Sequence, residues 1–362
     1  MDFTTTDEQR ALADATRGVL SRHGSPAAES GSSAQPPAHD TALWQALVEL
    51  GIPAMPWSEE DGGVGAGITD LAAAATELGR GRIQAPLAET VLAGTLVARL
   101  APAALRQQVL GAVSEGEALL VPALDEPMRT FDPTPHDVRA EEGADGWQVT
   151  GVKAPVRYAP AATHVVLTAR TASGTGVFLL TDPGATAERL DLDSTSVTLL
   201  AEGEAAEEAL RDALAVAGAL LCAEALGAME EALRMTTDYL RTRKQFGVPL
   251  AAFQALTHRA ADMYAQLELA RSATLFAAMS AEESPVDVDA VLRARVVVDK
   301  AARLIGQEAI QLHGGIGVTA EYPVGHLSAR LTMISRTWGS TRSHLATLGS
   351  RVAEHRSVDV LG

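Results

Sequence analysis

The sequence predicts an α+β protein in which a helical part is followed by a strand-rich part and then by a second helical part. Three observations predict this order. Apolar residues recur at steps of three and four over much of 3–114 and again beyond 203, which is the period of helices buried on one face. Between them, short β-type runs alternate with turn residues. Because sheet faces must be covered, we expect the strands to pack between the two helical parts.

The N-terminal part, residues 1–117, is predicted to be helical. The first expected helix spans 3–23 and can be capped by Thr6. Further helices are expected over 41–50, 69–80, 86–100 and 103–114. Residues 24–40 are small, polar and proline-rich, which predicts a flexible surface connection.

Residues 118–202 form the predicted β domain. Its strand-like runs include 147–150, 164–167 and 176–180, and turn residues such as Gly151 separate them. This spacing is typical of a small barrel or sandwich.

Residues 203–362 form the second helical part. Helices are expected over 205–241, 252–281, 288–312 and 326–350. The place where the two helical parts and the strands meet is a natural position for a ligand cleft.

The formal net charge of −17 disfavours nucleic acid, whose phosphates require clustered Lys and Arg, and equally an anionic membrane surface. The single cysteine, Cys222, excludes an intrachain disulfide and indicates a reducing compartment. No signal peptide is visible, and no apolar stretch reaches the roughly 20 residues that span a bilayer. We therefore expect a cytoplasmic protein with neither nucleic-acid nor membrane partners.

The segment from Tyr239 to Leu250 carries three cations within four residues, followed by Phe246-Gly247. Cations at the end of a helix complement the helix dipole. Arg243 and Lys244 beside an aromatic ring also suit a pyrophosphate and a stacked ring. The residues alone leave both interpretations open.

A glycine-rich segment, Gln311-Leu312-His313-Gly314-Gly315-Ile316-Gly317, follows the helix expected to end near 312. Glycines here either cap that helix or let the backbone approach an anionic ligand. No second ligand stands at metal-binding spacing from His313, so we expect no metal site.

Together and in this order, the Arg243–Gly247 and Gln311–Gly317 segments resemble the acyl-CoA dehydrogenase family. The resemblance covers nearly the whole chain. Three further segments carry it: Glu59–Gly65, Glu77–Arg80 and Gly146–Lys153.

The resemblance implies a helical N-terminal domain, a β-barrel-like middle domain and a C-terminal four-helix bundle. It implies FAD as the cofactor, lying between the β domain, the bundle and a neighbouring subunit. By position, the resemblance implies that the pyrophosphate and adenine parts of FAD are bound by Arg243, Gln245 and Phe246. It implies that FAD is contacted across the dimer interface by Gln311, Gly314 and Gly315. The implied reaction is α,β-dehydrogenation of an acyl-CoA, with electrons passed to an electron-transfer flavoprotein.

The sequence departs from the family at the catalytic base. The family uses a glutamate just before a glycine near the C-terminus, and alignment on Gly339 places Trp338 there. The alternative base position of some members falls near Ala217 or Gly218, again without a carboxylate. Glu224 is a further candidate, lying nearly two turns away and so facing elsewhere; a structural glutamate is the competing interpretation. The main-chain N–H of residue 338, which binds the thioester carbonyl in the family, is retained.

A second departure lies in the flavin strand, where the family's Thr-Glu-Pro motif is only partly matched by Asp125-Glu126-Pro127.

The segment Gly325–Leu327 with Arg330–Ile334 looks most like the small-subunit branch of two-component acyl-CoA dehydrogenases. A homologous subunit in a hetero-oligomer would explain a retained FAD framework beside a missing base. The alternatives are a self-sufficient homo-oligomer, a non-catalytic scaffold subunit, and a flavoenzyme acting on chains bound to acyl-carrier protein.

Overall fold

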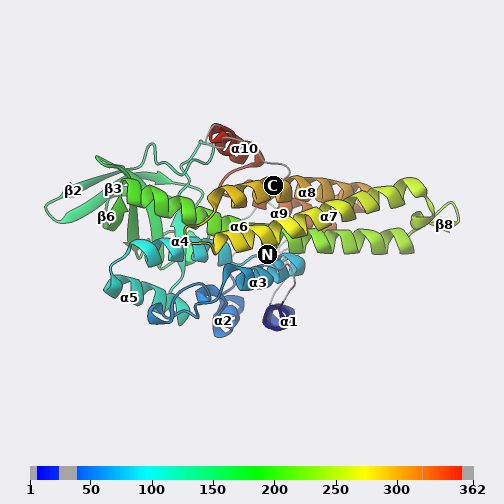
Figure 1. The fold of residues 1–362 in the computed structure, drawn as a ribbon, viewed down its shortest axis with the longest axis horizontal. Helices are drawn as coiled ribbons and strands as arrows, with labels where there is room; N and C mark the ends of the chain where they lie inside the picture. The colour runs from blue at the N-terminus through cyan, green and yellow to red at the C-terminus, as the bar shows by residue number, and fades with distance from the viewer. Residues whose placement is uncertain (1–5, 24–38, 320, 353–362) are drawn as a thin grey trace, which may run out of the picture.

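The computed structural model of the protein describes residues 6–23, 39–319 and 321–352. Its N-terminal part is helical, as predicted (Figure 1). The helices are α1 (Asp7–His23), α2 (Thr41–Glu49), α3 (Ile68–Gly81), α4 (Leu87–Leu100) and α5 (Ala103–Ser114). The hydroxyl of Thr6 accepts a hydrogen bond from the N–H of Gln9 at 3.1 Å and so caps α1, as expected. The predicted connection over 24–40 lies outside the described residues except for its last two.

The middle part is a closed, barrel-like sheet, which confirms the predicted β domain. Its strands are β1 (Leu120–Ala123), β2 (Arg139–Gly143), β3 (Gly146–Lys153), β4 (His164–Thr171), β5 (Gly174–Thr181) and β6 (Leu190–Glu202). They follow the order β1-β4-β2-β3-β6-β5, and an additional pairing of β4 with β5 closes the ring. Val149 and Phe178 are fully buried within this part. The closure removes most of the free sheet edges.

A buried ion pair anchors the loop that follows β1. The carboxylate of Glu126 accepts hydrogen bonds from the main-chain N–H groups of residues 136–138, at 2.8–3.3 Å, and from Nζ of Lys153 at 3.4 Å. The ammonium group also donates to the carbonyl of Leu124 and the hydroxyl of Thr168. Burial lowers the pKa of Lys153 to about 8, although Glu126 opposes this shift. The loop over 127–135 is therefore fixed at both ends.

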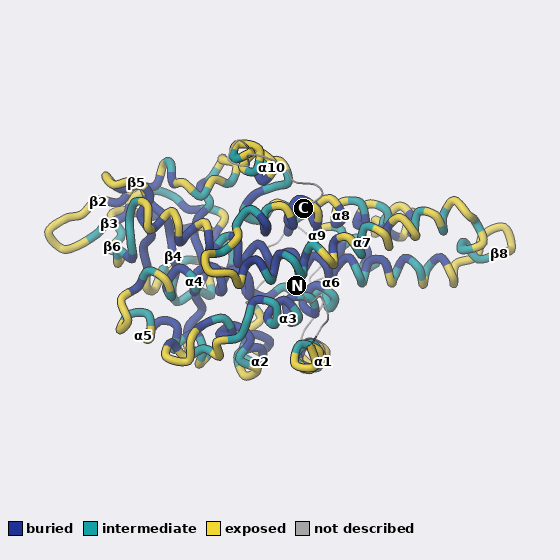
Figure 2. Tube along the Cα trace, in the orientation of Figure 1, coloured by how far each residue is buried: buried dark blue, intermediate teal, exposed yellow. Residues whose placement is uncertain are grey.

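The C-terminal part is a bundle built around one long helix. It comprises α6 (Glu204–Thr242), the hairpin β7 (Lys244–Gln245) and β8 (Val248–Pro249), α7 (Gln254–Ala281), α8 (Val288–His313), α9 (Pro323–Ile334) and α10 (Thr341–Ser350). Figure 2 shows that α6 is buried along most of its length. One 18-residue window of α6 is long and apolar enough to cross a membrane, but 94% of it is buried within the protein, as expected for a core helix.

The single helix predicted over 326–350 is wrong. The chain instead forms α9 and α10, separated by residues 335–340. Trp338 and Gly339 both have left-handed backbone angles, with φ of 52° and 124°. These values are incompatible with a continuous α-helix.

The N-terminal part and the bundle meet where α3 crosses α6 at two glycines. A Cβ atom on Gly79 would lie 1.9 Å from the carbonyl oxygen of Glu224, and one on Gly227 would lie 1.8 Å from that of Thr76. The two main chains are therefore in direct contact. Arg80 binds both Glu77 of α3 and Glu230 of α6 beside this crossing.

We expect Gly227→Ala to destabilise the protein by about 3 kcal/mol, because the added methyl group must push two helices apart. The free energy of unfolding in urea measures the effect. Gly111→Ala on α5 is the matched control, since a Cβ there meets nothing within 4 Å. It should be neutral or stabilise the helix by about 0.5–1 kcal/mol. Equal losses from both substitutions would contradict the close crossing.

Candidate active site

Two separate sets of predicted site residues lie at one end of the bundle. The ring of Tyr239, near the end of α6, packs against the ring of His313, at the end of α8, with centroids 4.6 Å apart. Tyr322, just before α9, packs on His313 at 5.0 Å. This aromatic cluster brings the segment that begins at Arg243 close to the glycine turn at 314–315.

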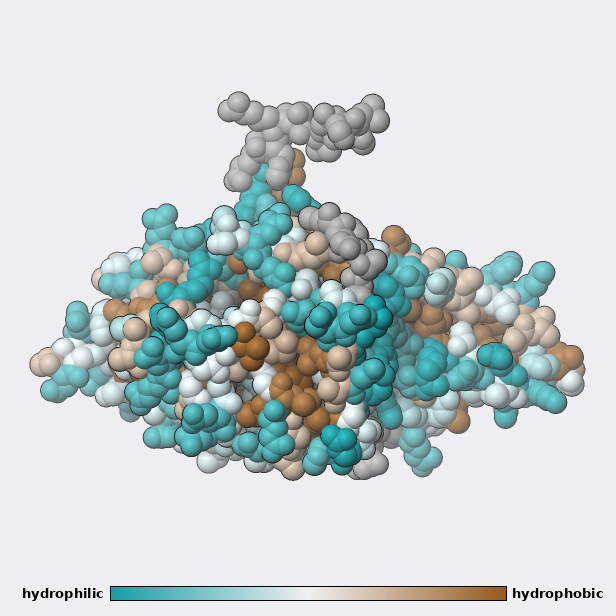
Figure 3. Space-filling model, turned by 60° about the horizontal axis from the view of Figure 1, so that its bottom comes forward, coloured by the Kyte–Doolittle hydropathy of each residue, from teal (hydrophilic) through white to brown (hydrophobic). Residues whose placement is uncertain are grey.

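Arg243, Gln245 and Phe246 are all exposed on the hairpin that joins α6 to α7. The guanidinium of Arg243 makes no hydrogen bond or ion pair with any described residue. The side-chain amide of Gln245 donates only to the carbonyl of Lys244, at 2.9 Å. Phe246 is 94% exposed, and hydrophobic atoms are visible at the right-hand tip in Figure 3. A free cation beside an exposed ring is an unusual surface unless it meets a ligand or a partner.

Gln311, Gly314 and Gly315 are exposed at the end of α8. The N–H of Gly314 is not available to an anionic ligand, which the sequence had left open. It donates to the carbonyls of Ile310 and Gln311 as the C-cap of α8. Its φ of 65° explains the glycine. Gly315 has no such angle, and a Cβ on either glycine would meet nothing within 4 Å. Internal packing therefore does not require glycine at 315. Close approach of a ligand or of another subunit would require it, because a side chain there would occupy the space.

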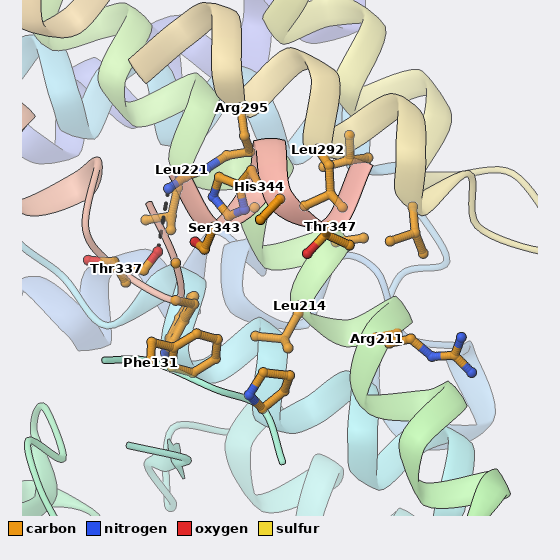
Figure 4. Close-up of a pocket in the computed structure, with 18 of the residues that line it drawn as sticks. Phe131, Arg211, Leu214, Leu221, Leu292, Arg295, Thr337, Ser343, His344 and Thr347 are labelled. Atoms are coloured by element: carbon orange, nitrogen blue, oxygen red, sulfur yellow. Dashed lines mark hydrogen bonds between the residues drawn. The ribbon is translucent and has the colours of Figure 1, made fainter. Parts of the chain in front are cut away.

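A cavity of about 390 Å³ lies between the bundle and the β domain (Figure 4). Its walls come from α6, α8, α10, the turn at 337–339 and the loop at 131–133, and their surface is mainly apolar, with arginines at 211, 295 and 351 among the lining residues. The apolar lining residues include Phe131, Leu214, Leu221, Val291 and Leu292. A cavity of this size and character suits an apolar small-molecule group.

Trp338 lies in the wall of this cavity, on the turn between α9 and α10. Its φ of 52° is rare for a bulky residue, and such backbone strain typically costs about 1–3 kcal/mol. Its main-chain N–H donates no hydrogen bond to any described residue. A main-chain N–H without a partner among the described residues would suit a carbonyl oxygen if it faces the cavity that Trp338 lines.

Both base positions implied by the family resemblance belong to this one cavity, because Gly218 on α6 lines it together with Trp338. Asp132 is the carboxylate among the described lining residues. It accepts hydrogen bonds from the N–H of Thr134 at 2.9 Å and from Nε2 of His136 at 3.0 Å. Although burial opposes it, these bonds hold the pKa of Asp132 below its usual value, which makes it a poor proton acceptor.

Glu224 lies away from this cavity. Its carboxylate accepts a hydrogen bond from Nε of Arg330 at 2.6 Å, and it lines a separate small cavity beside Gly79 and Arg82. Its partner and position agree with a structural role. No group of three or more His, Cys, Asp or Glu side chains able to hold a metal ion occurs among the described residues.

Sequence reasoning missed most of the lining residues, among them Phe131, Arg295 and His344. Phe131 stands in a loop without a motif. The signal for Arg295 was available, since an arginine on the apolar face of a helix needs buried acceptors.

Comparisons with known proteins agree with this architecture. The model of the acyl-CoA dehydrogenase N-terminal domain matches residues 6–117, and that of the C-terminal domain matches residues 208–353. The acyl-CoA dehydrogenase IpdE2 of Mycobacterium tuberculosis is 31% identical over 353 residues, which are 97% of this chain and 99% of that protein.

Two solved structures are similar throughout. The Tcur3481–Tcur3483 steroid ACAD has a TM-score of 0.85 at 31% identity and covers 96% of this chain and 98% of its own. The ChsE4–ChsE5 complex from Mycobacterium tuberculosis has a TM-score of 0.87 at 27% identity, and the match covers 99% of this chain and 100% of the matched chain. With fold, domain matches and a relative of full length in agreement, this chain belongs to the acyl-CoA dehydrogenase family of FAD-dependent oxidoreductases.

Proposed function

We propose that this chain is one subunit of a hetero-oligomeric acyl-CoA dehydrogenase whose homologous partner chain carries the catalytic carboxylate. The supporting observation is the cavity itself, whose two base positions, Gly218 and Trp338, carry no carboxylate, while the N–H of Trp338 has no partner among the described residues. Two similar structures are named for two chains each, the ChsE4–ChsE5 complex and the Tcur3481–Tcur3483 steroid ACAD.

FAD fits the exposed tip of the bundle. Arg243 has no partner among the described residues and would hold the pyrophosphate through its guanidinium. Phe246 would contact the adenine, and Gln311 with the glycines at 314–315 would approach the cofactor from a neighbouring subunit. When bound, FAD supplies the two-electron acceptor for dehydrogenation, and we assign its reoxidation to an electron-transfer flavoprotein.

The chain's own residues would bind and orient the acyl group. The mainly apolar walls exclude water, which strengthens every polar contact inside the cavity. The N–H of Trp338 would donate to the thioester carbonyl and so stabilise the negative charge that develops there when the α-proton is transferred to a base, which neither base position of this chain supplies. Without a general base, dehydrogenation at this site would be slower by a factor of about 10²–10⁴.

The acyl group is proposed to be bulky and apolar, because the cavity measures about 390 Å³ and its surface is mainly apolar. The similar Tcur3481–Tcur3483 protein is a steroid ACAD, in line with a ring-bearing acyl group. Coenzyme A is favoured over a carrier protein, since a chain of net charge −17 would repel a second acidic protein.

We expect Arg243→Met to raise the Kd for FAD about 10–100-fold in the co-expressed complex, because charge-assisted hydrogen bonds to the pyrophosphate are lost. Titration of the flavin-free complex, followed by flavin fluorescence, measures the Kd, and native mass spectrometry gives the subunit composition. Arg241→Met is the matched control. It removes an exposed arginine two residues away and should leave the Kd unchanged.

Two results would overturn this proposal. A mixed oligomer that binds no FAD at this chain would favour the non-catalytic scaffold subunit. A flavin-loaded oligomer of this chain alone that oxidises acyl-CoA would show that it is self-sufficient.

A further inference from the structure

Arg295 on α8 lies directly behind the turn that carries Trp338. Its side chain is 3% exposed, although arginine is rarely buried without full pairing. One guanidinium nitrogen donates to the carbonyl oxygens of Ile334 at 3.1 Å and Thr337 at 3.4 Å. Ile334 is the last residue of α9, and Thr337 immediately precedes Trp338. Figure 4 shows the guanidinium of Arg295 beside this segment.

The charge of Arg295 is only loosely balanced. The carboxylate of Asp299, one turn further along α8, lies 3.8 Å from the same nitrogen. The other terminal nitrogen of Arg295 and the second oxygen of Asp299 have no hydrogen-bond partner among the described residues. An arginine that served only to pair charges would be better satisfied. Its well-formed contacts are those to the turn.

His344 on α10 packs against the same turn, next to Arg295. A Cβ atom on Gly339 would lie 2.4 Å from Cε1 of His344, so the imidazole is in close contact with the glycine. Burial, together with the nearby charge of Arg295, lowers the pKa of His344 to about 4. The ring is therefore neutral at neutral pH and can pack closely against the main chain.

The turn that these two side chains contact needs external support. Trp338 and Gly339 both have positive φ angles, and strained backbone persists only where its surroundings determine it. The loss of either support would let Trp338 return to an ordinary backbone angle. Its N–H and indole would then leave the cavity wall.

We infer that Arg295 and His344 are positioning residues that hold the 337–339 turn, and with it the N–H and indole of Trp338, against the acyl cavity. This inference rests on the proposed function only for the identity of the ligand. Neither side chain is proposed to touch the reacting atoms.

The test follows Trp338 directly. The full-length chain, labelled with fluorinated tryptophan, should give four ¹⁹F resonances, from Trp44, Trp57, Trp147 and Trp338. The loss of one line in Trp338→Phe assigns it. In Arg295→Met we expect the Trp338 line to move or split while the other three lines stay in place, and Arg295→Lys should restore it in part. Arg259→Met, which removes an ion pair to Glu308 between α7 and α8, should move none of them.

An unmoved Trp338 line in a folded Arg295→Met variant would overturn the inference, and so would equal changes in all four lines. Should that variant not fold, His344→Gln decides, since it removes only the ring that packs on Gly339. Octanoyl-CoA added to the wild type is a separate readout. If the thioester leaves the Trp338 line unmoved while Arg295→Met displaces it, the proposed ligand fails and the positioning role stands.

Discussion

Trp338→Glu is expected to raise the rate of flavin reduction by an acyl-CoA about 10²–10⁴-fold at this chain's own site. The substitution would place a carboxylate at the position that the family resemblance gives for the base, in the cavity proposed to bind the acyl group. General-base assistance is typically worth this factor. Stopped-flow absorbance of the FAD-loaded, co-expressed complex measures it.

Trp338→Gln is the matched control. Glutamine has the size of glutamate, and its introduction also removes the indole. Its side chain, however, cannot accept the proton at neutral pH. We expect no gain in rate from it. A gain of equal size in both variants would mean that relief of crowding by the indole, rather than a base, limits the reaction. No gain in either would argue against a reactive site at this cavity.

The largest stability effect is expected from Glu126→Ala, at about 3–5 kcal/mol. The substitution leaves the fully buried ammonium of Lys153 without its counter-charge, and the breaking of a buried ion pair typically costs this amount. It also removes the acceptor of three main-chain N–H groups at 136–138. Equilibrium unfolding in urea, followed by circular dichroism, gives the free energy of unfolding.

Glu142→Ala, on the exposed end of β2, provides the comparison and should change stability by less than about 0.5 kcal/mol. Glu126→Gln should cost less than the alanine variant, since the amide oxygen still accepts from the main chain. A cost below about 1 kcal/mol for Glu126→Ala would show that water or a rearranged loop replaces the carboxylate.

The order of helical and strand-rich parts could be predicted because it depends on local periodicity. The 39-residue helix α6 and the strands β4 and β5 follow directly from their apolar patterns. The break between α9 and α10 could not be predicted in this way, because the residues at 326–350 keep a helical pattern of apolar positions. At that break Arg295, some 40 residues earlier in the chain, donates to the carbonyl of Ile334, and Ser340 begins α10 through a capping box with Ser343.

The candidate site was only partly predictable for the same reason. The resemblance identified residues 217–218 and 338 as equivalent base positions, and the structure places Gly218 and Trp338 in one cavity. The pattern of glycines did not reveal that the N–H of Gly314 is used by the C-cap of α8. Nor did any motif mark His344, whose role depends on a glycine five residues before it.

The close crossing of α3 and α6 has a consequence for how a ligand enters. Helices in main-chain contact through Gly79 and Gly227 cannot slide past each other without steric clash. The wall of the cavity that α6 forms is thus tied to the N-terminal part of the molecule. Motions that admit a bulky ligand must then come from the more exposed walls, α10 and the middle of the 127–135 loop between its fixed ends. Substrate exchange would accordingly depend on the local opening of these two segments, and its rate on their stability rather than on that of the bundle.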